Sequence, residues 1–163
     1  MLPDSFAYKN WADARTIAAV AEIDRVLHQQ PYAFALQQLN HILIVEDLFR
    51  SRLEKKPAPH GATNSDVVPE YDELKRRLTE SGVWYSQFVS TLEPSSRQSP
   101  VAFHFADGKP GTMSIEEILF HIVNHGSYHR GSIAHALDLA GVDHPADGYA
   151  IFIHQRDPDR RHI

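Results

Sequence analysis

Apolar residues recur every three or four positions along four long stretches of the chain, a spacing typical of amphipathic α-helices. The first predicted helix runs from about Asp4 to Gln29 and the second from about Tyr32 to Lys55, with Pro31 marking the boundary between them. The third begins at Pro69, a residue suited to the first position of a helix, and ends near Glu93.

The segment before the fourth helix has a different pattern. Residues 101–105 have the composition of a strand, and Asp107-Gly108 is a strong turn signal, so we expect a small hairpin or an extended loop. Ser114 and Glu117 then have the spacing of a capping box, which opens the fourth helix. We expect this helix to end at Gly141.

Four long helices with one apolar face each predict an all-α protein, a four-helix bundle with the small hairpin or loop before its last long helix. Residues 1–163 form one predicted domain, because the length is ordinary for a single domain and no repeat or internal boundary is visible. One short apolar turn is expected around residues 149–154.

Composition and charge exclude several functions. The chain has no cysteine, which excludes disulfides, thiolate metal sites and a cysteine nucleophile. A net charge of -5 argues against binding to a phosphate backbone, so no nucleic-acid partner is expected. No apolar run is long enough to cross a bilayer and the N-terminus lacks the pattern of a secretory signal, so we expect no membrane partner and a cytoplasmic location.

Histidine is the unusual component, with 11 residues. On a wheel of the fourth helix, His125 and His129 are about 40° apart and both fall within the apolar stripe that includes Ile122. His121 falls on the edge of this stripe and His135 lies further out. His125 and His129 are therefore the pair that we expect to point inward.

The second helix carries a third inward histidine. His41 lies at the centre of the apolar face that includes Phe34, Val45 and Leu48. An unpartnered polar ring costs about 1–3 kcal/mol to bury, and one divalent cation would satisfy three imidazoles at once. Three nitrogen ligands would leave a coordination position open, the pattern of a catalytic zinc site.

Two other interpretations of these histidines stay open at this point. The rings could be hydrogen-bonded core residues without a metal, because an HxxxH spacing also arises by chance. His121 could replace one member of the pair as a ligand, although its edge position better suits a role near the substrate. Glu117, one turn earlier, is placed to orient it.

Three segments resemble the DinB (DNA-damage-inducible) family. Residues 121–133, HIVNHGSYHRGSI, are similar to the HVVNHxxxHRGQ-type signature of that family, with Ser132 where Gln is common. Residues 39–43, LNHIL, resemble its second-helix histidine motif, and residues 8–15, YKNWADAR, resemble its YNxWANxR opening. The resemblance spans nearly the whole chain, and the motif in the fourth helix is the most specific part.

The resemblance implies a four-helix bundle of the DinB/YfiT-like type, usually a homodimer. It also implies one divalent metal held by His41, His125 and His129. Zinc or nickel is favoured, with iron, manganese or copper as alternatives.

The leading functional hypothesis is a metal-dependent enzyme that acts on a small molecule. A thiol-dependent S-transferase, with a low-molecular-weight thiol as cosubstrate, is favoured over a metal-activated hydrolase, and His121 and Tyr128 are the candidate catalytic groups. The alternative is a non-catalytic, metal-stabilised binding or stress-response interaction protein.

Overall fold

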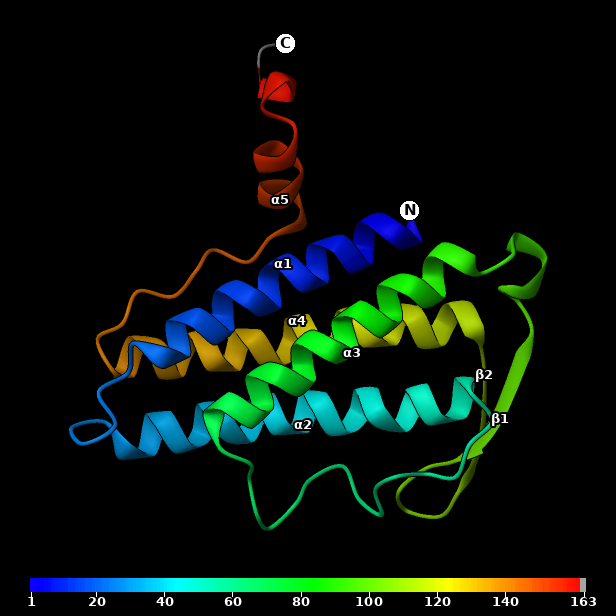
Figure 1. The fold of residues 1–163 in the computed structure, drawn as a ribbon, viewed down its shortest axis with the longest axis horizontal. Helices are drawn as coiled ribbons and strands as arrows, with labels where there is room; N and C mark the ends of the chain where they lie inside the picture. The colour runs from blue at the N-terminus through cyan, green and yellow to red at the C-terminus, as the bar shows by residue number, and fades with distance from the viewer. Residues whose placement is uncertain (162–163) are drawn as a thin grey trace.

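The computed structural model describes residues 1–161 and is dominated by helices (Figure 1). The elements, in chain order, are α1 (Leu2–Ala21), α2 (Gln29–Leu53), α3 (Tyr71–Thr91), the 3-10 turn η1 (Pro94–Ser96), β1 (Pro100–His104), β2 (Pro110–Ser114), α4 (Ile115–Leu139), α5 (Tyr149–Arg156) and the 3-10 turn η2 (Pro158–Arg161). None of the helices within residues 1–161 is long and apolar enough to cross a membrane.

The four long helices lie side by side (Figure 1). α2 packs against α3 and α4, and α1 packs against the same two helices, so each long helix has two long neighbours. α5 stands away from this body and contacts α1, where the ring of Phe152 packs against those of Tyr8 and Trp11. The predicted all-α class is confirmed in its broad form.

The segment before α4 is the predicted hairpin. β1 and β2 pair antiparallel, with Ala102 opposite Thr112, and Gly108 adopts a positive φ of 82° in the turn between them. Ser114 and Glu117 form the predicted capping box, in which each side chain accepts a hydrogen bond from the other residue's backbone N–H. The hairpin thus leads directly into the first turn of α4.

The boundary between the first two helices differs from the prediction. α1 ends at Ala21, and the Asp24 carboxylate accepts hydrogen bonds from the backbone N–H groups of Val26 and Leu27, a local turn that competes with helix. Leu27, which falls within the predicted first helix, is consequently outside α1 and 75% exposed. Pro31 does not separate the helices but lies in the first turn of α2, where a backbone N–H has no partner within the helix.

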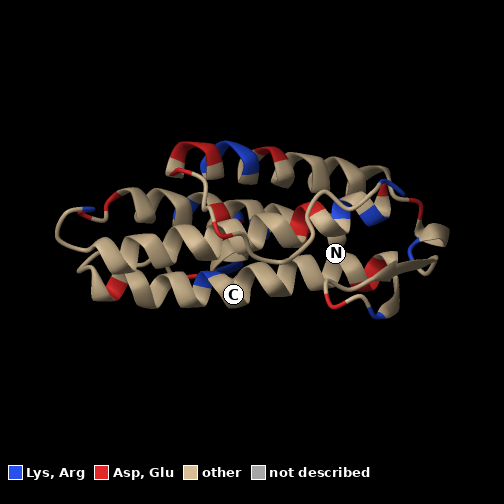
Figure 2. Ribbon diagram, turned by 90° about the horizontal axis from the view of Figure 1, so that it is seen from below, with Lys and Arg blue, Asp and Glu red and all other residues tan. Residues whose placement is uncertain are grey.

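α3 follows its predicted course with small shifts. It begins at Tyr71, two residues after Pro69, and its first half carries acidic and basic residues in alternation (Figure 2). Arg76 pairs there with Glu73 and Glu80 at helical spacing. Arg76 and its two acidic partners therefore form part of a solvated helix face.

Buried polar residues separate the two larger apolar clusters of the core. One apolar cluster includes Ile17, Leu43, Leu78 and Ile133, and the other includes Phe6, Phe49, Tyr85 and Ile122. Between these positions, α1, α2, α3 and α4 each contribute buried polar side chains, which are Lys9, Asp13, Glu46, Ser81 and Arg130. The predicted histidine cluster lies beside this polar layer.

Candidate metal centre

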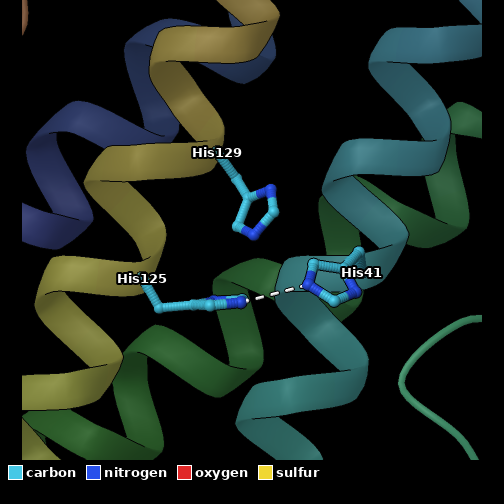
Figure 3. A group of neighbouring side chains, drawn as sticks. All are labelled: His41, His125 and His129. Carbon is cyan, nitrogen blue, oxygen red and sulfur yellow. Dashed lines mark hydrogen bonds between the residues drawn. The ribbon is translucent and has the colours of Figure 1, made fainter.

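Three imidazoles meet where α2 and α4 pack together (Figure 3). His41 comes from α2, and His125 and His129 come from successive turns of α4, so all three rings reach the same point. One nitrogen of each ring lies within 4.8 Å of one nitrogen of each of the others. The ring centroid of His41 is 5.0 Å from that of His125 and 4.4 Å from that of His129.

Hydrogen bonds to the far side of two rings fix their orientation. His41 Nδ1 lies 2.7 Å from the carbonyl oxygen of Thr63, and His129 Nδ1 lies 2.6 Å from Oε1 of Gln38. Because both oxygens only accept, each Nδ1 carries the proton and donates it. The Nε2 lone pairs of His41 and His129 are left for another partner, the arrangement found around metal-ligating histidines.

The third ring completes the set of donor atoms. His125 Nε2 lies 3.1 Å from His41 Nε2. Since His41 carries its proton on Nδ1, this contact requires His125 Nε2–H to donate to His41 Nε2. A divalent cation at this point would accept lone pairs from the three rings once the His125 proton has moved from Nε2 to Nδ1, so that all three imidazoles stay neutral.

The electrostatic environment keeps the rings of His125 and His129 neutral. Burial, together with the neighbouring imidazoles, lowers the pKa of His125 to about 3. Burial and His41 lower the pKa of His129 to about 4. Neutral imidazole is the form that binds a metal, so these two rings are ready to do so at pH 7.

The centre is closer to solvent than the sequence indicated. His41, His125 and His129 are half-buried, and Phe34, expected on the apolar face around His41, is 41% exposed. Phe34 lies near the start of α2, where this side of the helix is open to water. The three rings therefore lie at the edge of the core, which leaves one side of the cluster accessible.

The other candidate residues surround the cluster at different distances. The His121 ring lies 5.3 Å from that of His125 and 5.0 Å from that of Phe49, and it is not part of the group whose nitrogens converge. The Tyr128 ring meets the His129 ring edge-on at 5.1 Å, but Tyr128 is 72% exposed. His135 is exposed, as predicted.

Glu117 does not have the role suggested by its position. Its carboxylate accepts the backbone N–H of Ser114 in the capping box. Among residues 1–161, no hydrogen bond joins Glu117 to His121. The expectation that Glu117 orients His121 is therefore wrong, because the start of α4 already occupies this side chain.

A buried ion-pair network, which the sequence analysis missed, lies next to the histidines. The Lys9 ammonium is 2.6 Å from Asp13 Oδ2 and 2.6 Å from Glu46 Oε1. Arg130, the residue after His129, lies 2.8 Å from the other Asp13 oxygen and 2.6 Å from Asp147. The network ties α1 to α2 and α4, the two helices that carry the histidines.

Two signals in the sequence could have revealed this network. Lys9 and Asp13 are spaced i,i+4 on a helix face that is otherwise apolar, and Tyr8, Asp13 and Arg130 all fall within motif segments. Tyr8 donates a hydrogen bond to Asp147, which extends the network toward the surface. Gly126 makes room for the Arg130 side chain, since a Cβ at position 126 would lie 3.0 Å from Arg130 Nη1.

The residues present fit a divalent transition metal. Imidazole nitrogen is a ligand that zinc, nickel, copper and iron accept, and three such nitrogens converge here with two of the rings oriented by acceptors. The three histidines are thus positioned to hold one metal ion. Three protein ligands would leave further coordination positions for a water or a substrate.

Comparison with known proteins agrees with this arrangement. The profile of the DinB family matches residues 2–160. The chain is similar to Protein DinB of Bacillus subtilis (strain 168), with 25% identity over 164 residues that cover 91% of each chain. No solved structure is significantly similar to the chain. Since the family match spans nearly every described residue and includes all three converging histidines, the chain belongs to the DinB family.

Proposed function

We propose that this protein is a metal-dependent enzyme that acts on a small molecule, built on a four-helix bundle of the DinB/YfiT-like type. The convergence of three imidazole nitrogens from α2 and α4 is the observation that carries this proposal. Zinc or nickel is the proposed metal, and His41, His125 and His129 are its proposed ligands.

The favoured reaction is the transfer of a low-molecular-weight thiol to an electrophile. A bound divalent cation would supply a Lewis acid that keeps such a thiol ionised at neutral pH, and the same property would serve a hydrolase by acidifying water. The chain has no cysteine of its own, so the thiol would come from a second molecule. The three rings are half-buried, so the proposed metal site is not sealed from solvent.

Two side chains beside the proposed ligands are suited to proton transfer and positioning. Burial, assisted by Arg52, lowers the pKa of His121, so this ring is neutral at pH 7 and able to accept a proton. Tyr128 extends into solvent beside His129, where its hydroxyl could contact a substrate at the rim. His121 is the proposed base and Tyr128 the proposed substrate contact.

Metal analysis tests the ligand assignment. We expect untagged protein purified without chelator to hold close to one equivalent of metal by elemental analysis. His129→Ala should lose most of it, whereas His135→Ala, an exposed histidine on the same helix, should retain it. Equal metal content in the two variants would show that the ligands have been assigned wrongly.

Turnover tests the enzyme assignment. Metal-loaded protein is incubated with a panel of low-molecular-weight thiols and a chromogenic electrophile, and with a panel of esters and amides. We expect thiol transfer that chelation abolishes and added metal restores. Ester hydrolysis alone would favour the hydrolase.

One observation favours a non-catalytic alternative. The proposed ligands come from two helices, so a bound ion would also tie α2 to α4 and stabilise the fold. In that case metal would raise the melting temperature in the same experiments without turnover of any substrate. This result would support the metal site but contradict the proposal that the protein is an enzyme.

A further inference from the structure

A cavity lies away from the three histidines, between the C-terminal end of α2, the segment that follows it and the hairpin. Its volume is about 860 Å³, which is enough for a small organic ligand. Its apolar wall is formed mainly by Leu48, Val101, Phe103, Phe105 and Ile115. We refer to this cavity as the hairpin pocket.

The charged residues that line the hairpin pocket are all basic. They include Arg52, Lys55 and Lys56, and no aspartate or glutamate lines it. Lys56 is paired with Glu54 outside the pocket, at 3.2 Å. Arg52 and Lys55 have no carboxylate within 4.0 Å in the part of the chain that the structure describes, residues 1–161.

Arg52 is held in place by aromatic rings and not by an acid. Its guanidinium carbon lies 4.1 Å from the ring centroid of Phe103 and 4.5 Å from that of Phe49, and its Nη2 donates to the carbonyl oxygen of His104 at 3.1 Å. Burial lowers the pKa of Arg52, as expected for a cation that is partly desolvated without a counter-charge. Its other N–H groups remain available to a planar, two-oxygen acceptor.

The backbone conformation of Lys55 is a second, independent indication that the hairpin pocket is a functional site. Lys55 follows the last turn of α2 with a φ of 55°. Among residues 1–161, it is the only non-glycine residue with a positive φ. The closing hydrogen bond from Lys56 N to Ser51 O, at 2.8 Å, is that of a helix end at which glycine is normally preferred. Lysine adopts this conformation at an energetic cost that glycine would not have, and strained residues of this kind are concentrated at functional sites.

We propose that the hairpin pocket binds a small organic carboxylate, with the carboxylate at Arg52 and Lys55 and the apolar body against Phe103 and Phe105. The excess of positive charge selects the anion, and the aromatic wall selects the apolar body. This site is separate from the three histidines: the Phe49 ring lies between Arg52 and His121, 5.0 Å from the latter ring. The proposal does not depend on the proposed enzyme activity.

A pair of matched probes tests it. Naphthalene-2-carboxylate and its neutral amide, naphthalene-2-carboxamide, have the same ring system, and their binding to the full-length, metal-loaded protein is measured by calorimetry. We expect the carboxylate to bind about tenfold more tightly, the effect of one charge-assisted interaction of ordinary strength. The same preference is expected in His129→Ala, because the pocket does not use the metal ligands.

Two variants locate the effect in the hairpin pocket. Arg52→Met keeps an apolar stem against the rings and should abolish the preference. Lys55→Gly should weaken carboxylate binding several-fold while the melting temperature stays equal or rises, because glycine suits the positive φ. Lys75→Gln, an equal charge change on the exposed face of α3, is the control and should change nothing.

Each outcome of these binding experiments either supports or overturns the proposed carboxylate site. Loss of the preference in Arg52→Met and its reduction in Lys55→Gly, with its retention in Lys75→Gln, support the site. No detectable binding of the carboxylate, equal binding of the two probes, or an unchanged preference in the two pocket variants overturns it. Loss of the preference in His129→Ala also overturns it, since the carboxylate would then be bound at the metal.

Discussion

The ammonium nitrogen of Lys9 lies 2.6 Å from a carboxylate oxygen of Glu46, and both side chains are excluded from solvent. Burial alone would lower the pKa of Lys9, but the carboxylates of Asp13 and Glu46 outweigh it and raise the pKa. The pair joins α1 to α2 beside the histidine cluster. A buried pair of this kind contributes little by itself, but each charge depends on its partner.

Removal of the lysine should therefore destabilise the fold strongly. Lys9→Met leaves Glu46 without its cation, and we expect a loss of about 3–5 kcal/mol in the free energy of unfolding, measured by urea denaturation. Adding Glu46→Gln to this variant should recover part of the loss, because the uncompensated charge is then removed. A Lys75→Met control on exposed α3 should change stability by less than about 0.5 kcal/mol. Additive losses in the double variant would contradict the pairing.

Gln38 should influence metal binding without touching the metal. It accepts the hydrogen bond from His129 Nδ1 at 2.6 Å, which orients the ring. Gln38→Ala should weaken metal affinity by about 10–100-fold in competition titrations with a chelating dye. Gln37→Ala, which removes the exposed neighbouring glutamine, is the matched control and should leave the affinity unchanged. The same affinity in both variants would mean that Gln38 does not support the ligand.

The metal-free protein should lose stability in mild acid. The pKa values of His125 and His129 are lowered to about 3 and about 4 in the folded state, while the unfolded value is about 6.5. As the pH falls below 6.5, the unfolded chain takes up protons that the folded protein does not, so stability is present above that value and declines toward pH 4. Urea denaturation at a series of pH values, with chelator present, measures this slope.

A histidine variant tests whether the loss of stability in acid comes from the histidine cluster. His125→Gln should flatten the slope between pH 6.5 and 4, whereas His135→Gln, which changes an exposed ring, should retain it. If stability were constant across this range in the unaltered protein, the lowered pKa values of the cluster would be wrong.

The capping box should stabilise the start of α4. The Ser114 side chain accepts the backbone N–H of Glu117, and Ser114→Ala removes this acceptor. We expect a loss of about 1 kcal/mol in the free energy of unfolding, with metal binding retained because His125 lies more than two turns away. Thermal denaturation and metal titration of the same sample measure both effects. An alanine variant as stable as the parent would show that the cap is dispensable.

The order and faces of the long helices could be predicted from local pattern alone. The spacing of apolar residues placed His125 and His129 on one stripe of α4, and Ser114 with Glu117 marked where that helix begins. These features depend on residues within one or two turns of each other, so no knowledge of the fold is needed. The end of α1 was missed because a single side chain, Asp24, redirects the backbone against an otherwise helical composition.

The amino-acid sequence by itself determined which histidines share the apolar face of each helix. It also determined the family to which the chain belongs. Only the tertiary structure decided that His41 meets the other two rings, that Thr63 and Gln38 hold two of them, and that Lys9, Asp13, Glu46 and Arg130 form one buried network. Each of these relationships joins residues that are far apart in the chain. Their distances depend on how the helices pack, which the periodicity of any single helix does not specify.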